Sequence, residues 1–314
     1  MGKLAIISDL HVDINKFGES ELMQLWQVLQ KHKITRLHLA GDTANKVDRC
    51  LAVVEFFVNK GLSTTFHFGN HELADVPNEQ MMDHFPDPHF LNERYIALNE
   101  QTVLLGMNGW YDYQFSELKD YEAIVRMKRL YWYDRFIQRG KTDLEVNAEM
   151  LAAAKNLLDQ LEAKKLEVIL STHFVPKRAF IMYQSAPYER WNKLNAFLGS
   201  ESFGELLDRY SNIKQVVFGH THRRFEDKSI GHTIYSCRPF GYYYEWQLTR
   251  DFVLKEQLLD SYDPMKLRVL LRAHHPAFQA YQTQHLQEEF EQAMTIVPYL
   301  SLIHISEPTR LQLI

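Results

Sequence analysis

The feature that most constrains the fold of this chain is a repeated pattern in its first part. Short apolar runs, each closed by a polar residue, alternate with segments whose apolar residues recur at helical spacing. The apolar runs are residues 3–8, 34–42 and 62–70, and the helical segments are residues 19–32 and 47–61. This alternation favours a parallel sheet with helices on its faces. Ligands of such sheets bind at the carboxyl edge, where the closing polar residues would gather.

The rest of the chain predicts further strands and two helical additions. Apolar runs typical of strands lie at residues 101–112, 166–174 and 213–222. Residues 117–165 predict a helical insertion, either a cap over the site or a structural layer, and residues 175–200 predict an irregular segment facing the site. We expect one domain over residues 1–260 and a helical extension over residues 261–299.

Residues 300–314 stand apart from the rest of the sequence. Their sequence, LSLIHISEPTRLQLI, resembles the in-frame translation of a transposon-type sequencing-library adapter. Our hypothesis is that the natural chain is interrupted near Leu300 and that the tail is not biological. The alternative is an ordinary frayed terminus, and on either interpretation the segment has no part in function.

Composition and charge restrict the class of protein and its location. The chain has 46% hydrophobic and 24% charged residues, as globular proteins do, and a formal net charge of −5. That charge provides no general attraction for nucleic acid, although a local basic groove could still bind it. The two cysteines, Cys50 and Cys237, do not make a disulfide framework, and we expect Cys50 to be a buried thiol. Because no apolar stretch suits a signal peptide or a membrane span, we expect a cytoplasmic protein without membrane contact.

Polar side chains suited to metal binding close the predicted strands. They are Asp9, His11, Asp42, Asn70, His71, His173, His220 and His222. In an extended segment, residues two apart point to the same side, so each Asp-x-His or His-x-His pair can aim two ligands into one space. Imidazole, carboxylate and amide ligands suit divalent Mn, Fe or Zn, and the absence of cysteine from the set argues against a structural zinc site.

Each of these short patterns is weak evidence by itself. An aspartate after a strand is usually a cap or turn residue, and a lone His-x-His pair is more often structural than metal-binding. Glycine precedes Asp42, Asn70 and His220, where a bare backbone permits a sharp turn. Since all the patterns occur together, each at the end of an apolar strand, we interpret them as one site.

The series DLH, GDTAN, GNHE, STH and GHTH resembles the calcineurin-like metallophosphoesterases, a superfamily of phosphoprotein phosphatases, phosphodiesterases and some nucleases. The resemblance implies a four-layer α/β/β/α sandwich with two divalent metal ions at the sheet edge. It also implies that one metal is held by Asp9, His11, Asp42 and His222. The second is held by Asn70, His173 and His220, with Asp42 as the bridge. His71 matches the histidine that the family places near the leaving group.

The residue types fit this chemistry independently. Two cations about 3.5–4 Å apart can clamp the oxygens of an in-line displacement, and a water that bridges them becomes the nucleophile without any serine or cysteine. His71, if protonated, could donate a proton to the departing alkoxide, or it could bind the transferring phosphoryl group.

Asn45 departs from the commonest pattern of the family. Phosphoprotein phosphatases carry an aspartate there, which hydrogen-bonds the equivalent histidine and is followed by an Arg-Gly pair, whereas this chain has Asn45, Lys46 and Val47. An amide could orient His71 but brings no charge to stabilise an imidazolium. A helix N-cap is an equally weighted role for Asn45, since a predicted helix follows it.

We predict hydrolysis of a small phosphodiester or phosphomonoester, with nucleic acid as a less favoured substrate. Asn45 and the missing Arg-Gly pair disfavour a phosphoprotein phosphatase, while a nuclease remains an alternative. Lys177, Arg178 and Tyr183 could hold a phosphate or stack a base, although a solvated face or packed cluster is slightly favoured for them. The competing class is a non-catalytic scaffold for protein interaction, and the complete set of expected ligands argues against it.

Overall fold

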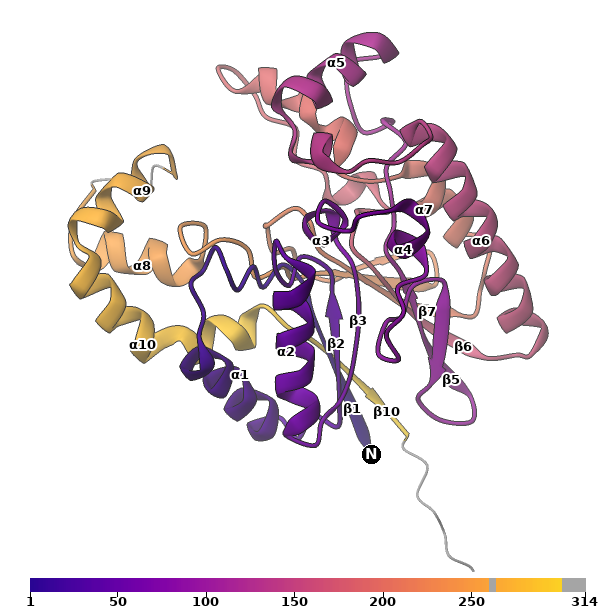
Figure 1. Cartoon of the computed structure of the whole chain (residues 1–314), viewed down its shortest axis with the longest axis horizontal. Coiled ribbons are helices and arrows are strands. Elements are labelled where there is room, and N and C mark those ends of the chain that lie inside the picture. The colour runs from indigo at the N-terminus through magenta and orange to yellow at the C-terminus, as the bar shows by residue number, and fades with distance from the viewer. Residues whose placement is uncertain (260–263, 301–314) are drawn as a thin grey trace, which may run out of the picture.

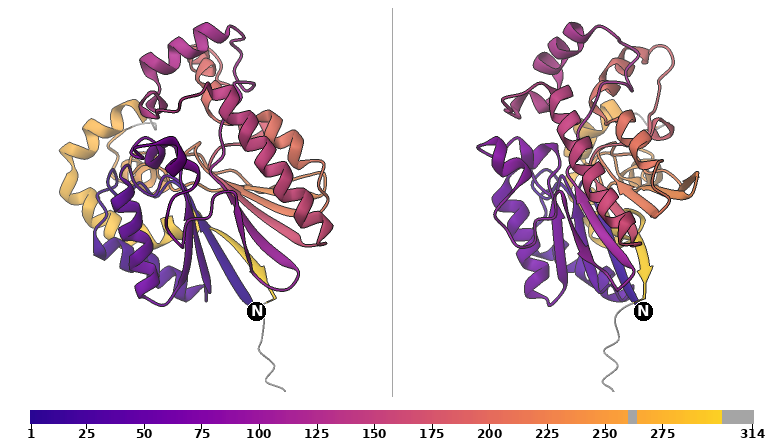
Figure 2. Two further views of the ribbon diagram at one scale, coloured as in Figure 1. Left: turned by 45° about the vertical axis from the view of Figure 1, so that its right-hand side comes forward. Right: turned by 90° about the vertical axis from the view of Figure 1, so that its right-hand side faces the viewer.

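A computed structural model describes residues 1–259 and 264–300, in which two β-sheets pack face to face with helices on their outer faces (Figure 1; Figure 2). The first sheet has the strand order β10-β1-β2-β3. Its strands are β1 (Gly2–Ile7), β2 (Arg36–Ala40), β3 (Ser63–His67) and β10 (Thr295–Tyr299). The first three are parallel, as the alternation of strands and helices predicts, and β10 pairs antiparallel with β1.

The second sheet has the strand order β4-β5-β6-β7-β9-β8. Its strands are β4 (Arg94–Ala97), β5 (Thr102–Met107), β6 (Glu167–Thr172), β7 (Ile213–Phe218), β8 (Lys228–Ile230) and β9 (Thr233–Cys237). β5, β6, β7 and β9 are parallel, and β4 and β8 are antiparallel edges. The sequence pattern did not predict β4, β8, β9 or β10. Three of these are short edge strands, which show little periodicity of their own.

Helices cover both outer faces of the pair of sheets. The apolar core outside the first sheet includes residues of α1 (Glu19–Lys31), α2 (Val47–Asn59), α8 (Gln247–Lys255), α9 (Pro264–Ala273) and α10 (His275–Gln292). The core outside the second sheet includes residues of α6 (Asp143–Ala163) and α7 (Glu201–Leu207). The remaining helices are α3 (Asn70–Leu73), α4 (Glu79–Asp83), α5 (Tyr121–Tyr131), and the 3-10 helices η1 (Tyr133–Phe136), η2 (Arg178–Phe180) and η3 (Glu189–Phe197).

A third apolar core joins the inner faces of the two sheets. Leu4 and Ile6 of β1 are buried there with Leu104 of β5, Ile169 of β6 and Val217 of β7. The predicted four-layer α/β/β/α sandwich is therefore confirmed, with α5, η1 and α6 as its helical insertion. The C-terminal segment is helical as far as Gln292 and then forms β10, which lies within the range predicted to be helical.

The described residues include both cysteines but not the predicted tail. Cys50 is buried, as predicted, and Cys237 is also a buried free thiol. No helix among the described residues has both the length and the apolar character needed to span a bilayer. The predicted adapter-derived tail lies, beyond Leu300, outside the described residues.

Two histidines are buried in neighbouring strands of the first sheet. The ring centroids of His38 in β2 and His67 in β3 are 5.0 Å apart, and both side chains are fully buried. His38 Nδ1 is 2.9 Å from Thr65 Oγ1, and its Nε2 has no hydrogen-bond partner. Burial lowers the pKa of His38 from 6.5 to about 3, so the ring is neutral in the folded protein.

The depressed pKa of His38 predicts that acid destabilises the protein. Between pH 6.5 and pH 3 the unfolded chain binds a proton at His38 that the folded chain does not, so stability falls as the pH is lowered. From pH 7 to pH 5 this residue should cost about 2 kcal/mol of unfolding free energy. Urea denaturation in chelator should show that His38→Gln loses less stability than wild type over this interval. The exposed control His84→Gln should behave as wild type, and an equal pH dependence in His38→Gln would contradict the prediction.

Candidate functional site

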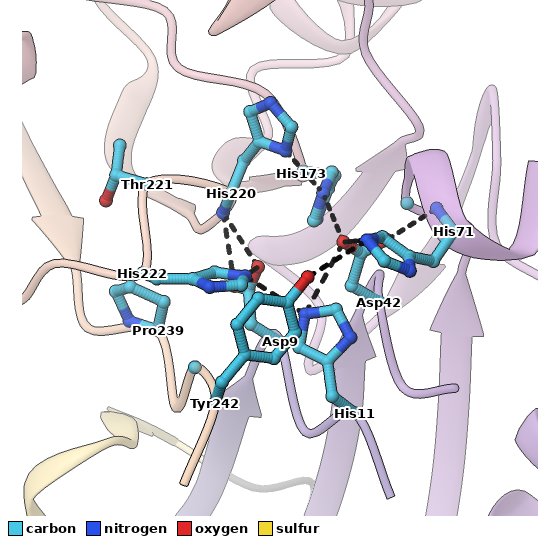
Figure 3. Close-up of polar contacts among 12 residues, drawn as sticks. Asp9, His11, Asp42, His71, His173, His220, Thr221, His222, Pro239 and Tyr242 are labelled. Atoms are coloured by element: carbon cyan, nitrogen blue, oxygen red, sulfur yellow. Dashed lines mark hydrogen bonds and ion pairs between the residues drawn. The ribbon is translucent and has the colours of Figure 1, made fainter. Parts of the chain in front are cut away.

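The carboxyl edges of both sheets meet at one cluster of polar side chains (Figure 3). Asp9 and His11 follow β1, Asp42 follows β2, Asn70 and His71 open α3, His173 follows β6, and His220 and His222 follow β7. Every metal ligand predicted from the sequence therefore lies at this edge. The Asp9, Asp42 and His173 side chains are almost completely buried. The cluster thus sits at the junction of the sheets rather than on the open surface.

The backbone at these strand ends is not extended. The expectation that the Asp-x-His and His-x-His pairs lie in extended segments is therefore wrong. The ligands with positive φ are Asp9 (59°), His11 (40°), Asp42 (51°), His220 (67°) and His222 (49°). Such conformations are uncommon for residues other than glycine and cost on the order of 1–3 kcal/mol each, so the surrounding structure must impose them. They bring paired side chains into one space by sharp turns instead of by strand geometry.

Two glycines make room for the carboxylates of the cluster. A Cβ atom on Gly69 would lie 2.1 Å from Asp42 Oδ1, and one on Gly219 would lie 2.1 Å from Asp9 Oδ2. Both distances are shorter than any side chain tolerates. The glycines before Asn70 and His220 are therefore required by close approach of the carboxylates.

The side chains form two groups of ligand atoms that share Asp42. The first contains Asp9, His11, Asp42 and His222, and the second contains Asp42, His173 and His220. Within each group the ligand atoms lie within 4.8 Å of one another. Asn70 joins the second group, because its Oδ1 is 3.1 Å from His173 Nε2. Carboxylate, imidazole and amide atoms gathered around two centres are a donor set that fits two divalent cations.

Hydrogen bonds orient three of the imidazole rings. His173 Nδ1 donates to the carbonyl of Ala40 at 3.2 Å, and His220 Nε2 donates to the carbonyl of Phe197 at 3.2 Å. His222 Nδ1 is 2.8 Å from the Glu245 carboxylate. Since these oxygens can only accept, the opposite nitrogen of a neutral ring carries its lone pair into the cluster. This is how proteins present histidine to a metal.

Electrostatics at the cluster are dominated by its two buried carboxylates. Burial disfavours charge here, yet attraction between Asp42 and His173 outweighs it, so the pKa of Asp42 lies well below its usual range and the pKa of His173 rises to about 9. The pKa of His222 likewise rises against burial to about 10 beside Glu245 and Asp9. Bound cations would balance the same carboxylate charge once these two protons leave.

His71 is held by Asn45 on one side and by aromatic rings on the others. Asn45 Oδ1 lies 2.6 Å from His71 Nδ1, and Tyr133 stacks on the ring with centroids 4.0 Å apart. Tyr242 Oη is 3.3 Å from His71 Nε2. Helix α2 begins at Val47 with Lys46 at its N-cap position and no side-chain cap. Asn45 therefore orients His71 in this structure and is not the cap of the helix.

Several residues around the cluster were not identified from the sequence. Glu72 accepts the backbone N–H groups of Asp42, Ala44 and Gly69, each at 2.9 Å. Buried Asp134 accepts from Asn70 Nδ2 at 2.8 Å, which turns the amide oxygen of Asn70 toward the ligands. Only Glu72 lies within a recognisable sequence pattern, GNHE. Asp134, Glu245, Tyr133 and Tyr242 come from segments far along the chain and have no local pattern.

The three residues proposed to bind substrate are engaged elsewhere. Lys177 Nζ contacts Asp208 at 2.6 Å, Arg178 pairs with Glu201, and Tyr183 Oη donates to the carbonyl of Phe115 at 2.8 Å. These contacts match the alternative of a packed and solvated cluster. A substrate-binding role for Lys177, Arg178 and Tyr183 stays a prediction.

Comparisons with known proteins place this geometry in a family. A family model described as calcineurin-like phosphoesterase matches residues 2–224. The solved structure of phosphopantetheinyl hydrolase from Mycobacterium tuberculosis is 19% identical with a TM-score of 0.60, covering 78% of this chain and 92% of that chain. A dimetal phosphatase from Danio rerio is 12% identical with a TM-score of 0.48, covering 76% and 87%. A search of curated proteins found no match.

The contact between Glu245 and His222 predicts an effect on metal affinity. Glu245→Ala removes the acceptor that orients the ring, and we expect Mn²⁺ affinity measured by calorimetry to fall roughly 10–100-fold. Glu245→Gln keeps an acceptor oxygen and should lose less. Glu226→Ala, which removes an exposed carboxylate, is the matched control and should bind as wild type. An unchanged affinity in Glu245→Ala would show that this contact does not support metal binding.

Proposed function

We propose that this chain, which belongs to the calcineurin-like phosphoesterase family, hydrolyses a small phosphodiester or phosphomonoester with the help of two divalent metal ions. The observation that carries the proposal is the position of Asp42, whose carboxylate is shared by two groups of ligand atoms. A carboxylate with two oxygens is suited to hold two cations close together. Mn, Fe and Zn all accept this mixture of oxygen and nitrogen ligands.

The proposed roles of the residues follow from their positions. Asp9, His11, Asp42 and His222 would hold one ion, and Asp42, Asn70, His173 and His220 would hold the other. When bound, such ions polarise the phosphoryl oxygens and activate water for in-line attack. His71 lies beside Asp42, with its Nε2 3.8 Å from Asp42 Oδ2, and would bind the phosphoryl group or protonate the leaving oxygen. Asn45 would be a positioning residue for His71.

The same residues argue against two other functions, a non-catalytic scaffold and a phosphoprotein phosphatase. A non-catalytic scaffold would tolerate loss of ligands, yet the whole set is present and oriented. A neutral Asn45 against His71 disfavours the acid dyad of phosphoprotein phosphatases, while a nuclease remains an alternative. The buried free thiols of Cys50 and Cys237 agree with a reducing compartment such as the cytoplasm. A phosphopantetheinyl compound belongs in the substrate screen beside cyclic nucleotides and oligonucleotides, because one similar structure is named a phosphopantetheinyl hydrolase.

The proposal predicts separable losses of metal and of rate. With Mn²⁺, wild type should hydrolyse bis-p-nitrophenyl phosphate or p-nitrophenyl phosphate, and chelator should abolish this. Asp42→Ala should lose bound metal in elemental analysis, because both groups share that carboxylate. His71→Ala should keep its metal and lose roughly 10²–10⁴-fold in kcat. His84→Ala, an exposed histidine, is the control for His71→Ala. Equal loss of metal in Asp42→Ala and His71→Ala would contradict these roles, and a wild type that neither binds metal nor turns over would favour the scaffold.

Asn45→Asp is expected to change the pH dependence of the reaction. A carboxylate within 2.6 Å of His71 Nδ1 would stabilise the imidazolium and raise the pKa of His71, which burial now lowers. If protonated His71 takes part in turnover, the alkaline limb of the kcat profile should move up by about one pH unit or more. Asn45→Ala should reduce kcat without an upward shift. An unchanged profile in Asn45→Asp would remove Asn45 from the mechanism.

A further inference from the structure

A pocket of about 560 Å³ is lined by His71 and by residues of the C-terminal helices α9 and α10. Asn45, His71, Tyr133 and Tyr242 line it on the side of the ligand cluster. Figure 1 shows α8, α9 and α10 gathered as one lobe at the side of the molecule. The pocket therefore joins the proposed reaction centre to a part of the chain beyond residues 2–224, which match the family model.

The volume of this pocket exceeds what a phosphoryl group needs. Ligand pockets of about 300–1,000 Å³ enclose organic molecules of drug size. The lining includes the consecutive residues Tyr242, Tyr243 and Tyr244, and the backbone N–H of Tyr243 donates to Asn15 Oδ1 at 2.7 Å. Aromatic walls with hydroxyl groups suit an organic substituent that is partly apolar and partly hydrogen-bonding. The volume of the pocket is thus sufficient to hold the alcohol part of an ester.

The charge of the pocket is positive. Lys16, Arg268 and Arg272 line it, and Glu21 is the one carboxylate among its described lining residues. Glu21 is engaged at the start of α1, where its carboxylate accepts from Gly18 N–H and Ser20 Oγ, each at 2.7 Å. Among the described lining residues, no other carboxylate competes with an anionic ligand for these three basic side chains.

Arg268 and Arg272 are spaced by four residues on α9, which places both on one face of the helix. Like charges at this spacing repel, and two guanidinium groups facing one pocket are stabilised when an anion lies between them. Arg268 lies with its guanidinium 5.4 Å from the centroid of Tyr244, which positions the planar group over a pocket wall. Guanidinium groups suit phosphoryl oxygens because they can donate two parallel hydrogen bonds.

We propose that this pocket binds the alcohol part of the substrate and that Arg268 and Arg272 hold a second phosphoryl group carried by that part. The inference rests on the proposed function, since it takes the first phosphoryl group to lie at the ligand cluster beside His71. It narrows the substrate to an organic bisphosphate or a phosphodiester whose alcohol bears a further phosphate. The C-terminal helices then take part in selecting the substrate, because they carry the two arginines.

The test compares ligands that differ only in the second anion and cannot be hydrolysed. Alkylphosphonates and α,ω-alkanebisphosphonates of equal chain length, from butane to decane, are titrated calorimetrically into Mn²⁺-loaded and chelator-treated protein. In wild type, one or more bisphosphonates should bind on the order of ten-fold more tightly than the matching monophosphonate, the gain expected from one charge-assisted contact. In the double variant Arg268→Gln/Arg272→Gln this preference should disappear, while monophosphonate affinity is retained.

The control variant is Arg94→Gln, which removes the positive charge of an exposed arginine on β4, an edge strand of the second sheet. It should keep both the preference for bisphosphonates and the hydrolysis of bis-p-nitrophenyl phosphate. No preference in wild type at any chain length, or a preference that persists in the double variant, would overturn the inference. A different result would show that the proposed function fails while the inference about the pocket holds. In that case wild type would prefer bisphosphonates but would hydrolyse no ester in the presence of Mn²⁺.

Discussion

The buried carboxylate of Asp42 is the group on which the rest of the site depends. Its Oδ1 accepts the backbone N–H of His71 at 2.9 Å, and its Oδ2 lies 3.4 Å from His173 Nε2. A charge that is only 1% exposed must be balanced by nearby groups, because desolvation of an unpaired carboxylate costs several kcal/mol. Since Asp42 follows β2 of the first sheet and His173 follows β6 of the second, this balance couples the two sheets at their carboxyl edges.

Support for Asp42 and its neighbours comes from outside the strand ends. Glu72 holds three backbone N–H groups around the turn that carries Asp42, and Asp134 of the helical insertion fixes the amide of Asn70. In the same insertion, Tyr133 stacks on His71. Segment η1 of the insertion is therefore part of the site's packing, whereas α6 lies in the outer layer over the second sheet. The insertion thus includes both a wall of the site and a structural layer.

The parts of the structure that could be predicted from sequence are those in which neighbouring residues carry the information. Apolar runs predicted β1, β2, β3, β5, β6 and β7, and the polar residues that end five of these strands include every residue of the ligand cluster. The edge strands β4, β8 and β10 escaped prediction because their pairing partner, not their own pattern, makes them strands. β10 contains Pro298, which an edge strand accommodates, and it forms only by pairing with β1 at the opposite end of the chain.

The sequence by itself determined the donor atoms and their place at strand ends, because residue type and strand periodicity are local properties. Tertiary structure decided which atoms meet. It placed the Asn45 side chain against His71 rather than at a helix cap, and it brought Glu245 to His222. It also placed the arginines of α9 in the lining of the pocket that His71 lines. These contacts join segments distant in the chain, and their distances depend on how two sheets and the C-terminal helices pack. No local pattern encodes that packing, since it results from apolar surfaces buried jointly by the whole chain.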